Sequence, residues 1–179
     1  MHRGIITLSL LAVFVGCGPK PPADFPKTYP CSIVVMKSGA PVEQATVILS
    51  AEGAGFPGGL VCTGMTDGRG KAGIKTSYAS FVRDGAPKAD YKVLIIKDPK
   101  PPETKTREEQ MVMKKTERDA YEANRAKARD SMPLIVPLLL TKAKTTPIEL
   151  TVSEGSNTLT VNVDDYKDPP GTKRESSRP

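Results

Sequence analysis

Apolar residues recur at every second position in several short segments of this chain. A two-residue repeat places these side chains on one face of an extended strand and their neighbours on the other face. Many short strands at this spacing favour two packed sheets. We therefore expect a mainly β fold, a two-sheet antiparallel Greek-key sandwich of about seven strands. The segments expected to form strands are 31–35, 45–50, 60–66, 71–75, 91–95, 148–152 and 159–163.

Turn-forming residues separate these segments. Ser38-Gly39 follows the first strand. The run 67–70, with the sequence Asp-Gly-Arg-Gly, predicts a tight hairpin because Asp-Gly tolerates the positive φ that such turns need. A further turn at 154–157 lies between two alternating segments, 148–152 and 159–163, and this pair is expected to form the clearest hairpin of the chain.

The segment 103–130 breaks the two-residue pattern. It lacks Gly and Pro and is rich in Glu, Lys, Arg and Ala, so it predicts one long helix inserted into the sandwich. Its few apolar residues leave two arrangements open, light docking on the sandwich or projection from it. The insertion is either a solvated element without a partner or a partner-binding arm. In the second case the contact residues would be Met111, Val112, Met113 and Tyr121.

The N-terminus has the features of an export signal. His2 and Arg3 precede the apolar run 5–15, and Cys17 follows Gly16. Residues 1–16 resemble a bacterial lipoprotein signal, in which the cysteine after the cut is diacylated. The match departs at position −3, where Phe14 stands in place of the usual Leu. The resemblance implies lipidation of Cys17 and a membrane-anchored protein of the cell envelope, facing the periplasm or the cell exterior.

Two alternatives to this signal stay open, an ordinary secretory peptide and an uncleaved anchor helix. The eleven residues of the apolar run would span about 16 Å as a helix, against a hydrocarbon core of ~30 Å. A full membrane span is therefore disfavoured.

Proline-containing polar segments flank the expected sandwich, 31–166. Residues 17–30 contain five prolines, which favour a polyproline II stalk of about 40 Å. Residues 167–179 are polar with three prolines and are expected to be disordered.

Composition limits the chemistry. His2 lies in the signal and is the only histidine, and the chain has no Trp. Without imidazole, Ser-His-Asp and Cys-His machinery and His-ligated zinc are excluded. The net charge is +6, or +5 without Arg3 (25 basic against 20 acidic residues), and it is interspersed. We therefore expect no catalytic residue, metal, cofactor or nucleic-acid partner.

If the Cys17 thiol carries lipid, two cysteines remain that could pair, Cys31 and Cys62. In an oxidising compartment they could form a disulfide closing a loop of about 30 residues, worth roughly 3–4 kcal/mol. Two small buried thiols are the alternative, since free Cys packs as a hydrophobic residue.

Other candidate residues have simpler interpretations. Asp67, next to Gly68, is expected to form a turn rather than to bind metal. Asp164 and Asp165 could pair as acid and base or bind calcium, but a solvated strand end is favoured. The glycine-rich segment 53–59 has no Lys-Ser/Thr after it, so it predicts a mobile loop rather than a phosphate site.

Tyr78, Phe81 and Arg83 fall on an expected loop, where aromatic and cationic groups could stack on a sugar. Such a surface would suit a glycan or cell-wall ligand. The absence of Trp and the small number of aromatic residues give this carbohydrate platform little support.

Four short motifs follow one another along the chain: 39–47 (GAPVEQATV), 66–72 (TDGRGKA), 85–93 (GAPKADYKV) and 146–152 (TPIELTV), the last followed by Gly155 and Asn157. In this order they resemble the carboxypeptidase regulatory-like, or transthyretin-like, β-sandwich domains found in many bacterial lipoproteins. The chain departs from the family at Ala89-Asp90, where Gly-Glu is usual, and in the longer, more helical segment 98–132.

This resemblance implies a transthyretin-like sandwich and a non-catalytic accessory or binding role. Relatives that hydrolyse 5-hydroxyisourate use histidines and a C-terminal Tyr-Arg-Gly-Ser, and outside the expected signal this chain has neither. We therefore expect a lipid-anchored, non-enzymatic module with a structural or protein-interaction role. The alternatives are a glycan- or wall-binding module and a hydrolase, which would need two carboxylates ~5–9 Å apart.

Overall fold

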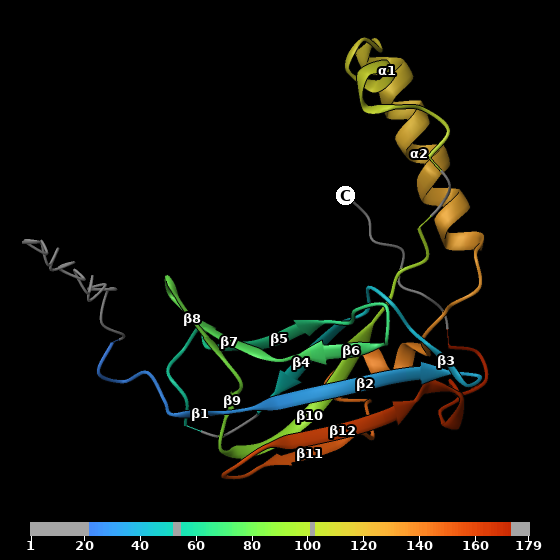
Figure 1. The fold of residues 1–179 in the computed structure, drawn as a ribbon. Helices are drawn as coiled ribbons and strands as arrows, with labels where there is room; N and C mark the ends of the chain where they lie inside the picture. The colour runs from blue at the N-terminus through green and yellow to red at the C-terminus, as the bar shows by residue number, and fades with distance from the viewer. Residues whose placement is uncertain (1–21, 52–54, 101–102, 173–179) are drawn as a thin grey trace, which may run out of the picture.

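Alternating burial along the strands produces two sheets that pack face to face (Figure 1). The computed structural model describes residues 22–51, 55–100 and 103–172. In β2 (Cys31–Lys37) residues 31, 33 and 35 are buried and the intervening positions are half-buried. The mainly β sandwich expected from the two-residue repeat is confirmed.

The larger sheet has six strands, and all neighbours in it are antiparallel. Several strands are longer or shorter than expected, and the expected loop at 78–83 is part of a strand pair. In spatial order the strands are β11 (Glu149–Val152), β10 (Ala89–Ile96), β4 (Thr46–Ser50), β5 (Val61–Met65), β7 (Lys75–Tyr78) and β8 (Phe81–Asp84).

The smaller sheet is built around β2. Its neighbours are β12 (Asn157–Asn162) on one side and β3 (Ala40–Pro41) and β6 (Lys71–Gly73) on the other. The pair β2–β12 is parallel, so the expectation of purely antiparallel sheets was wrong for this pair. β1 (Thr28–Tyr29) and β9 (Ala86–Pro87) form a short antiparallel pair.

The core lies between the two sheets and takes side chains from both. Each buried Val, Leu or Ile contributes about 1.5–3 kcal/mol by leaving water. Fully buried positions from the strands include Ile33, Val35, Val47, Val93, Ile95 and Val152.

The expected hairpin of 148–152 and 159–163 does not form. β11 pairs with β10 in the large sheet, whereas β12 pairs with β2 in the small sheet. Asn157 closes the turn between them: its side chain accepts from the Ser153 amide at 3.0 Å and donates to Pro30 O at 3.3 Å. Both strands have one buried face, so alternation alone cannot distinguish two strands that pair from two that face each other across a core.

The turn at 67–70 forms as expected. The Asp67 carboxylate accepts the amides of Arg69 and Lys71, both at 2.9 Å. On the return strand Ala72 and Ile74 are buried. This strand changes sheets at Ile74, however, since β6 before it pairs with β2 and β7 after it pairs with β5.

The predicted helix 103–130 is divided in two. α1 (Arg107–Met111) begins at a capping box in which Thr106 and Glu109 bond each other's amides, and α2 (Lys115–Ser131) follows after three residues. No Gly or Pro marks this break. Neither helix has a buried residue, and Figure 1 shows both standing away from the sandwich.

After α2 the chain returns to the core. Val136 and Leu140 are buried, the latter within the 3-10 helix η1 (Leu138–Thr141). The Asp168 carboxylate accepts the amides of Leu138 at 2.9 Å and Leu139 at 2.8 Å. Asp168 is the second residue of the segment 167–179 that we expected to be disordered, so the start of this segment is hydrogen-bonded to the domain. Residues 173–179 lie outside the described residues.

Candidate functional site

An aromatic and cationic cluster lies at the tip of the β7–β8 hairpin. Tyr78 and Phe81 are paired across the two strands. Ala79 and Ser80 form the turn, and Ala79 has φ +52°. The hairpin therefore brings together Tyr78, Phe81 and Arg83, the three residues that the sequence analysis selected.

The centre of this cluster is Phe25, which the sequence analysis did not select. Its ring centroid lies 6.4 Å from that of Tyr78, and the Arg83 guanidinium lies 5.4 Å from the Phe25 ring. The Tyr78 hydroxyl donates to the Asp24 carboxylate at 3.0 Å, which raises the pKa of Tyr78. The signal in the sequence was the presence of aromatic residues, Phe25 and Tyr29, within the proline-containing segment 17–30.

Part of the expected stalk is therefore packed on the domain. The Phe25 amide donates to Pro22 O at 3.0 Å, forming a turn. Three residues on, Thr28 pairs with Pro87 and its hydroxyl donates to Asp84 O at 2.9 Å. From Pro22 onward the chain lies against the sandwich, and only residues 17–21 of the expected stalk lie outside the described residues.

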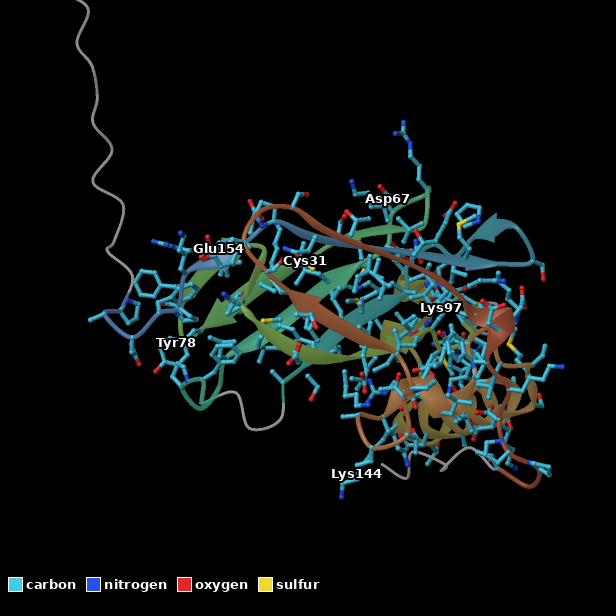
Figure 2. All side chains as sticks on the ribbon, turned by 90° about the horizontal axis from the view of Figure 1, so that it is seen from below. Cys31, Asp67, Tyr78, Lys97, Lys144 and Glu154 are labelled. Carbon is cyan, nitrogen blue, oxygen red and sulfur yellow. The ribbon has the colours of Figure 1, made fainter. Side chains whose placement is uncertain are left out.

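The helices α1 and α2, which we call the arm, project from the other end of the molecule. Figure 2 shows Tyr78 and Glu154 at one end of the sandwich and Lys97 and Lys144 at the opposite end. The arm follows Lys97 in the chain, and Figure 1 shows α1 furthest from the sheets. α2 has 17 residues, so it extends about 25 Å.

The arm has an internal structure of its own. Glu103, on the segment leading up to α1, lies 3.7 Å from the Arg125 guanidinium, and Arg125 lies over the Tyr121 ring at 5.8 Å. The Tyr121 hydroxyl and Arg125 Nε are both shielded from solvent and make no hydrogen bond within the described residues.

Of the four apolar residues that the sequence analysis placed in the arm, Met111 is 68% and Val112 84% exposed. Met113 and Tyr121 are half-buried. The most apolar part of the arm is thus its outer end, between α1 and α2.

Cys31 and Cys62 lie in the core as free thiols. Burial, together with the neighbouring Cys62, raises the pKa of Cys31 to about 11. Burial also raises the pKa of Cys62, whose Sγ lies 3.3 Å from the Thr76 hydroxyl. The disulfide is not formed in the structure and stays a prediction.

A small cavity of about 210 Å³ opens beside Cys62. The Phe56 and Tyr91 rings are stacked with their centroids 6.4 Å apart, and the Tyr91 hydroxyl donates to Pro87 O at 2.9 Å. Burial raises the pKa of Tyr91 above its ordinary value of 10.

Of the glycine-rich segment 53–59, residues 55–59 are described and 53–54 lie outside the described residues.

The acidic candidates have structural partners. Asp67 forms the turn described above. The hydrogen bonds that its carboxylate accepts from the backbone amides of Lys71 and Arg69 lower the pKa of this carboxyl group. Asp164 accepts the amide and the hydroxyl of Ser38, and Asp165 accepts from the Asn162 side chain at 3.3 Å. The part of the chain that the structure describes holds no group of three or more His, Cys, Asp or Glu side chains arranged for a metal ion.

Two predicted features lie wholly outside the described residues, the signal 1–16 and the lipidation site Cys17. Among the residues that are described, no helix is both long and apolar enough to cross a membrane. No family model, curated protein or solved structure matches the chain.

Proposed function

We propose that this chain is a lipid-anchored, non-enzymatic module of the cell envelope that presents a helical arm to a protein partner. The observation that carries the proposal is the placement of the arm. The N-terminal segment joins the sandwich beside Tyr78, whereas α1 and α2 project from the opposite end (Figures 1 and 2). A domain anchored through Cys17 would thus hold the arm away from the membrane.

The surface of the arm supports this role. Neither α1 nor α2 contributes a buried residue to the sandwich, so the insertion adds little to the stability of the core. Met111 and Val112 are largely exposed at its outer end. Methionine and aromatic side chains are enriched in protein interfaces, and association would remove this apolar surface from water.

Polar groups in the arm support the same interpretation. The Tyr121 hydroxyl and Arg125 Nε are shielded but unpaired within the described residues. Leaving a shielded polar group unpaired costs about 1–3 kcal/mol. A partner that shifts the segment around Glu103, or supplies an acceptor itself, would recover part of this free energy.

The proposal includes membership of the transthyretin-like lipoprotein domains. The support is the two-sheet sandwich and the position of the motifs in it. The motif 66–72 contains the Asp67 turn, and the motif 85–93 contains β9 and the first half of β10. The long insertion, which forms α1 and α2, is a departure of this chain from the family pattern.

Glycan or cell-wall binding is the weaker alternative. It depends on Tyr78, Phe81 and Arg83 offering flat faces to a sugar. Phe25 packs against two of these three side chains, Tyr78 and Arg83. The contacts at this cluster therefore favour attachment of the N-terminal segment over ligand binding.

In-cell photocrosslinking tests the proposed partner surface. A benzophenone amino acid replaces Val112 at the end of the arm, and the matched control replaces Met65, which is 65% exposed on β5. We expect a discrete adduct from position 112 that position 65 does not give, and loss of that adduct on Met111→Ser. Identical adduct patterns from both positions, or no adduct from position 112, would contradict the proposal.

A further inference from the structure

We propose that the β7–β8 hairpin and the packed N-terminal segment form a membrane-contact surface, which rests on a bilayer containing anionic lipid. We call this set, consisting of Phe25, Lys27, Phe81, Val82 and Arg83, the hairpin surface. The inference rests on the proposed lipid anchor and adds where the folded domain touches the membrane.

The first argument is the length of chain between anchor and domain. Five residue steps separate Cys17 from Pro22, the first described residue. A chain reaches at most about 3.6 Å per step, so these steps span no more than about 18 Å. Pro22 in turn lies beside Phe25, since its carbonyl accepts the Phe25 amide at 3.0 Å. A lipid on Cys17 therefore keeps Phe25 close to the bilayer.

The second argument is the rigidity of the attachment. Phe25 packs against Tyr78 and Arg83, and Asp24 accepts the Tyr78 hydroxyl at 3.0 Å. The short N-terminal segment is thus fixed to the hairpin. Whatever holds the N-terminus at the membrane also brings Tyr78 and Phe81 to it.

The third argument is the chemistry of the hairpin surface. Phe81 is half-buried on the edge strand β8. Val82, 60% exposed, points to the opposite face of this strand, so the hairpin presents apolar side chains on both faces. Lys27 and Arg83 add exposed positive charge, while Asp24 is bonded to Tyr78. Aromatic rings settle at the level of lipid headgroups, and nearby Lys and Arg are attracted to anionic lipid.

The absence of tryptophan from the chain allows a direct test. Phe81→Trp places a single fluorophore on the hairpin surface, and Val112→Trp places the matched control on the arm. Each full-length acylated protein is reconstituted into phosphatidylcholine–phosphatidylglycerol vesicles with acyl-brominated lipids, and flotation is measured in the same samples. Tyr78→Trp serves as a second reporter where Phe81→Trp does not fold.

We expect both proteins to float. The indole at position 81 should be blue-shifted and quenched at least about two-fold more than the indole at position 112, because interfacial side chains enter the acyl boundary by ~5–10 Å. Floating protein in which the indole at position 81 is quenched no more than the one on the arm would overturn this inference and leave the lipid anchor standing. Protein that does not float would overturn the anchor, and the inference with it.

Discussion

Gly85 lies directly against the carbonyl oxygen of Tyr29. A Cβ atom added at Gly85 would stand 2.1 Å from that oxygen, and Gly85 has φ +92°. Its amide donates to Ile74 O and its carbonyl accepts the Thr76 hydroxyl, both at 2.7 Å. Gly85 is therefore hydrogen-bonded to Ile74, where the chain changes sheets, and to Thr76 of β7, and it packs against Tyr29 of the N-terminal strand β1.

Gly85→Ala should destabilise the domain by about 2–3 kcal/mol, since the variant combines a left-handed backbone with a backbone clash. Chemical denaturation would measure the loss. Gly73→Ala is the control, because a Cβ there meets nothing within 4 Å. Equal effects of the two substitutions would show that the close approach to Tyr29 is not what requires glycine.

Alkaline pH should weaken the fold through the buried thiols. The Cys31 pKa is raised from 9.0 to about 11 by burial, so the unfolded chain loses this proton first. Stability is then complete below about pH 9 and falls as pH rises toward 11, by about 2 kcal/mol near pH 10.5. Burial raises the pKa values of Cys62 and Tyr91 as well, and these groups act in the same direction.

Free energies of unfolding near pH 8 and pH 10.5 check this prediction. Cys31→Ala should show a smaller decrease between the two pH values than the native chain. If both proteins lose the same free energy, the Cys31 thiol is not responsible.

The thiol state of Cys31 and Cys62 is directly measurable. In a chain whose Cys17 carries the proposed lipid, the buried thiols of Cys31 and Cys62 should resist alkylation near pH 8 while the protein is native. Unfolding without reductant should then expose two reactive thiols. Intact-mass spectrometry gives both results. A chain that accepts no label after unfolding contains the disulfide that the cysteine count suggested.

Cys17→Ser should move the protein from the membrane to the soluble fraction, because the substitution removes the thiol that would carry the lipid. Immunoblots of fractionated cells measure this redistribution, and Cys62→Ser controls for loss of a thiol as such. Unchanged membrane association of the Cys17 variant would mean that residues 1–16 are not a lipoprotein signal.

Asp168→Ala should destabilise the domain by about 1 kcal/mol, since two backbone amides at the start of η1 lose their acceptor. Asp165→Ala is the matched control, as Asp165 only accepts from the Asn162 side chain at 3.3 Å. Thermal unfolding of both variants provides the comparison. A smaller loss of stability on substitution of Asp168 than of Asp165 would show that the hydrogen bonds from Leu138 and Leu139 to Asp168 do not stabilise the domain.

Local features of this protein were accessible from the sequence. The alternation of Ile33 and Val35 with half-buried neighbours, and the turn at Asp67, depend on interactions within a few residues. Arrangements between distant segments were not accessible in the same way. The hairpin brings Tyr78, Phe81 and Arg83 together, but Phe25, which contacts Tyr78 and Arg83, lies more than fifty residues earlier.

The sequence by itself determined that the alternating segments are strands and which of their faces is buried, because a period of two is a property of the backbone alone. It did not reveal β8 (Phe81–Asp84), where a loop was expected. Only the tertiary structure decided that β12 pairs with β2 and not with β11, and that the strand after Asp67 divides between the sheets at Ile74. A strand with one apolar face can satisfy its hydrogen bonds beside any compatible edge. Which edge it takes depends on how all the apolar faces are buried together.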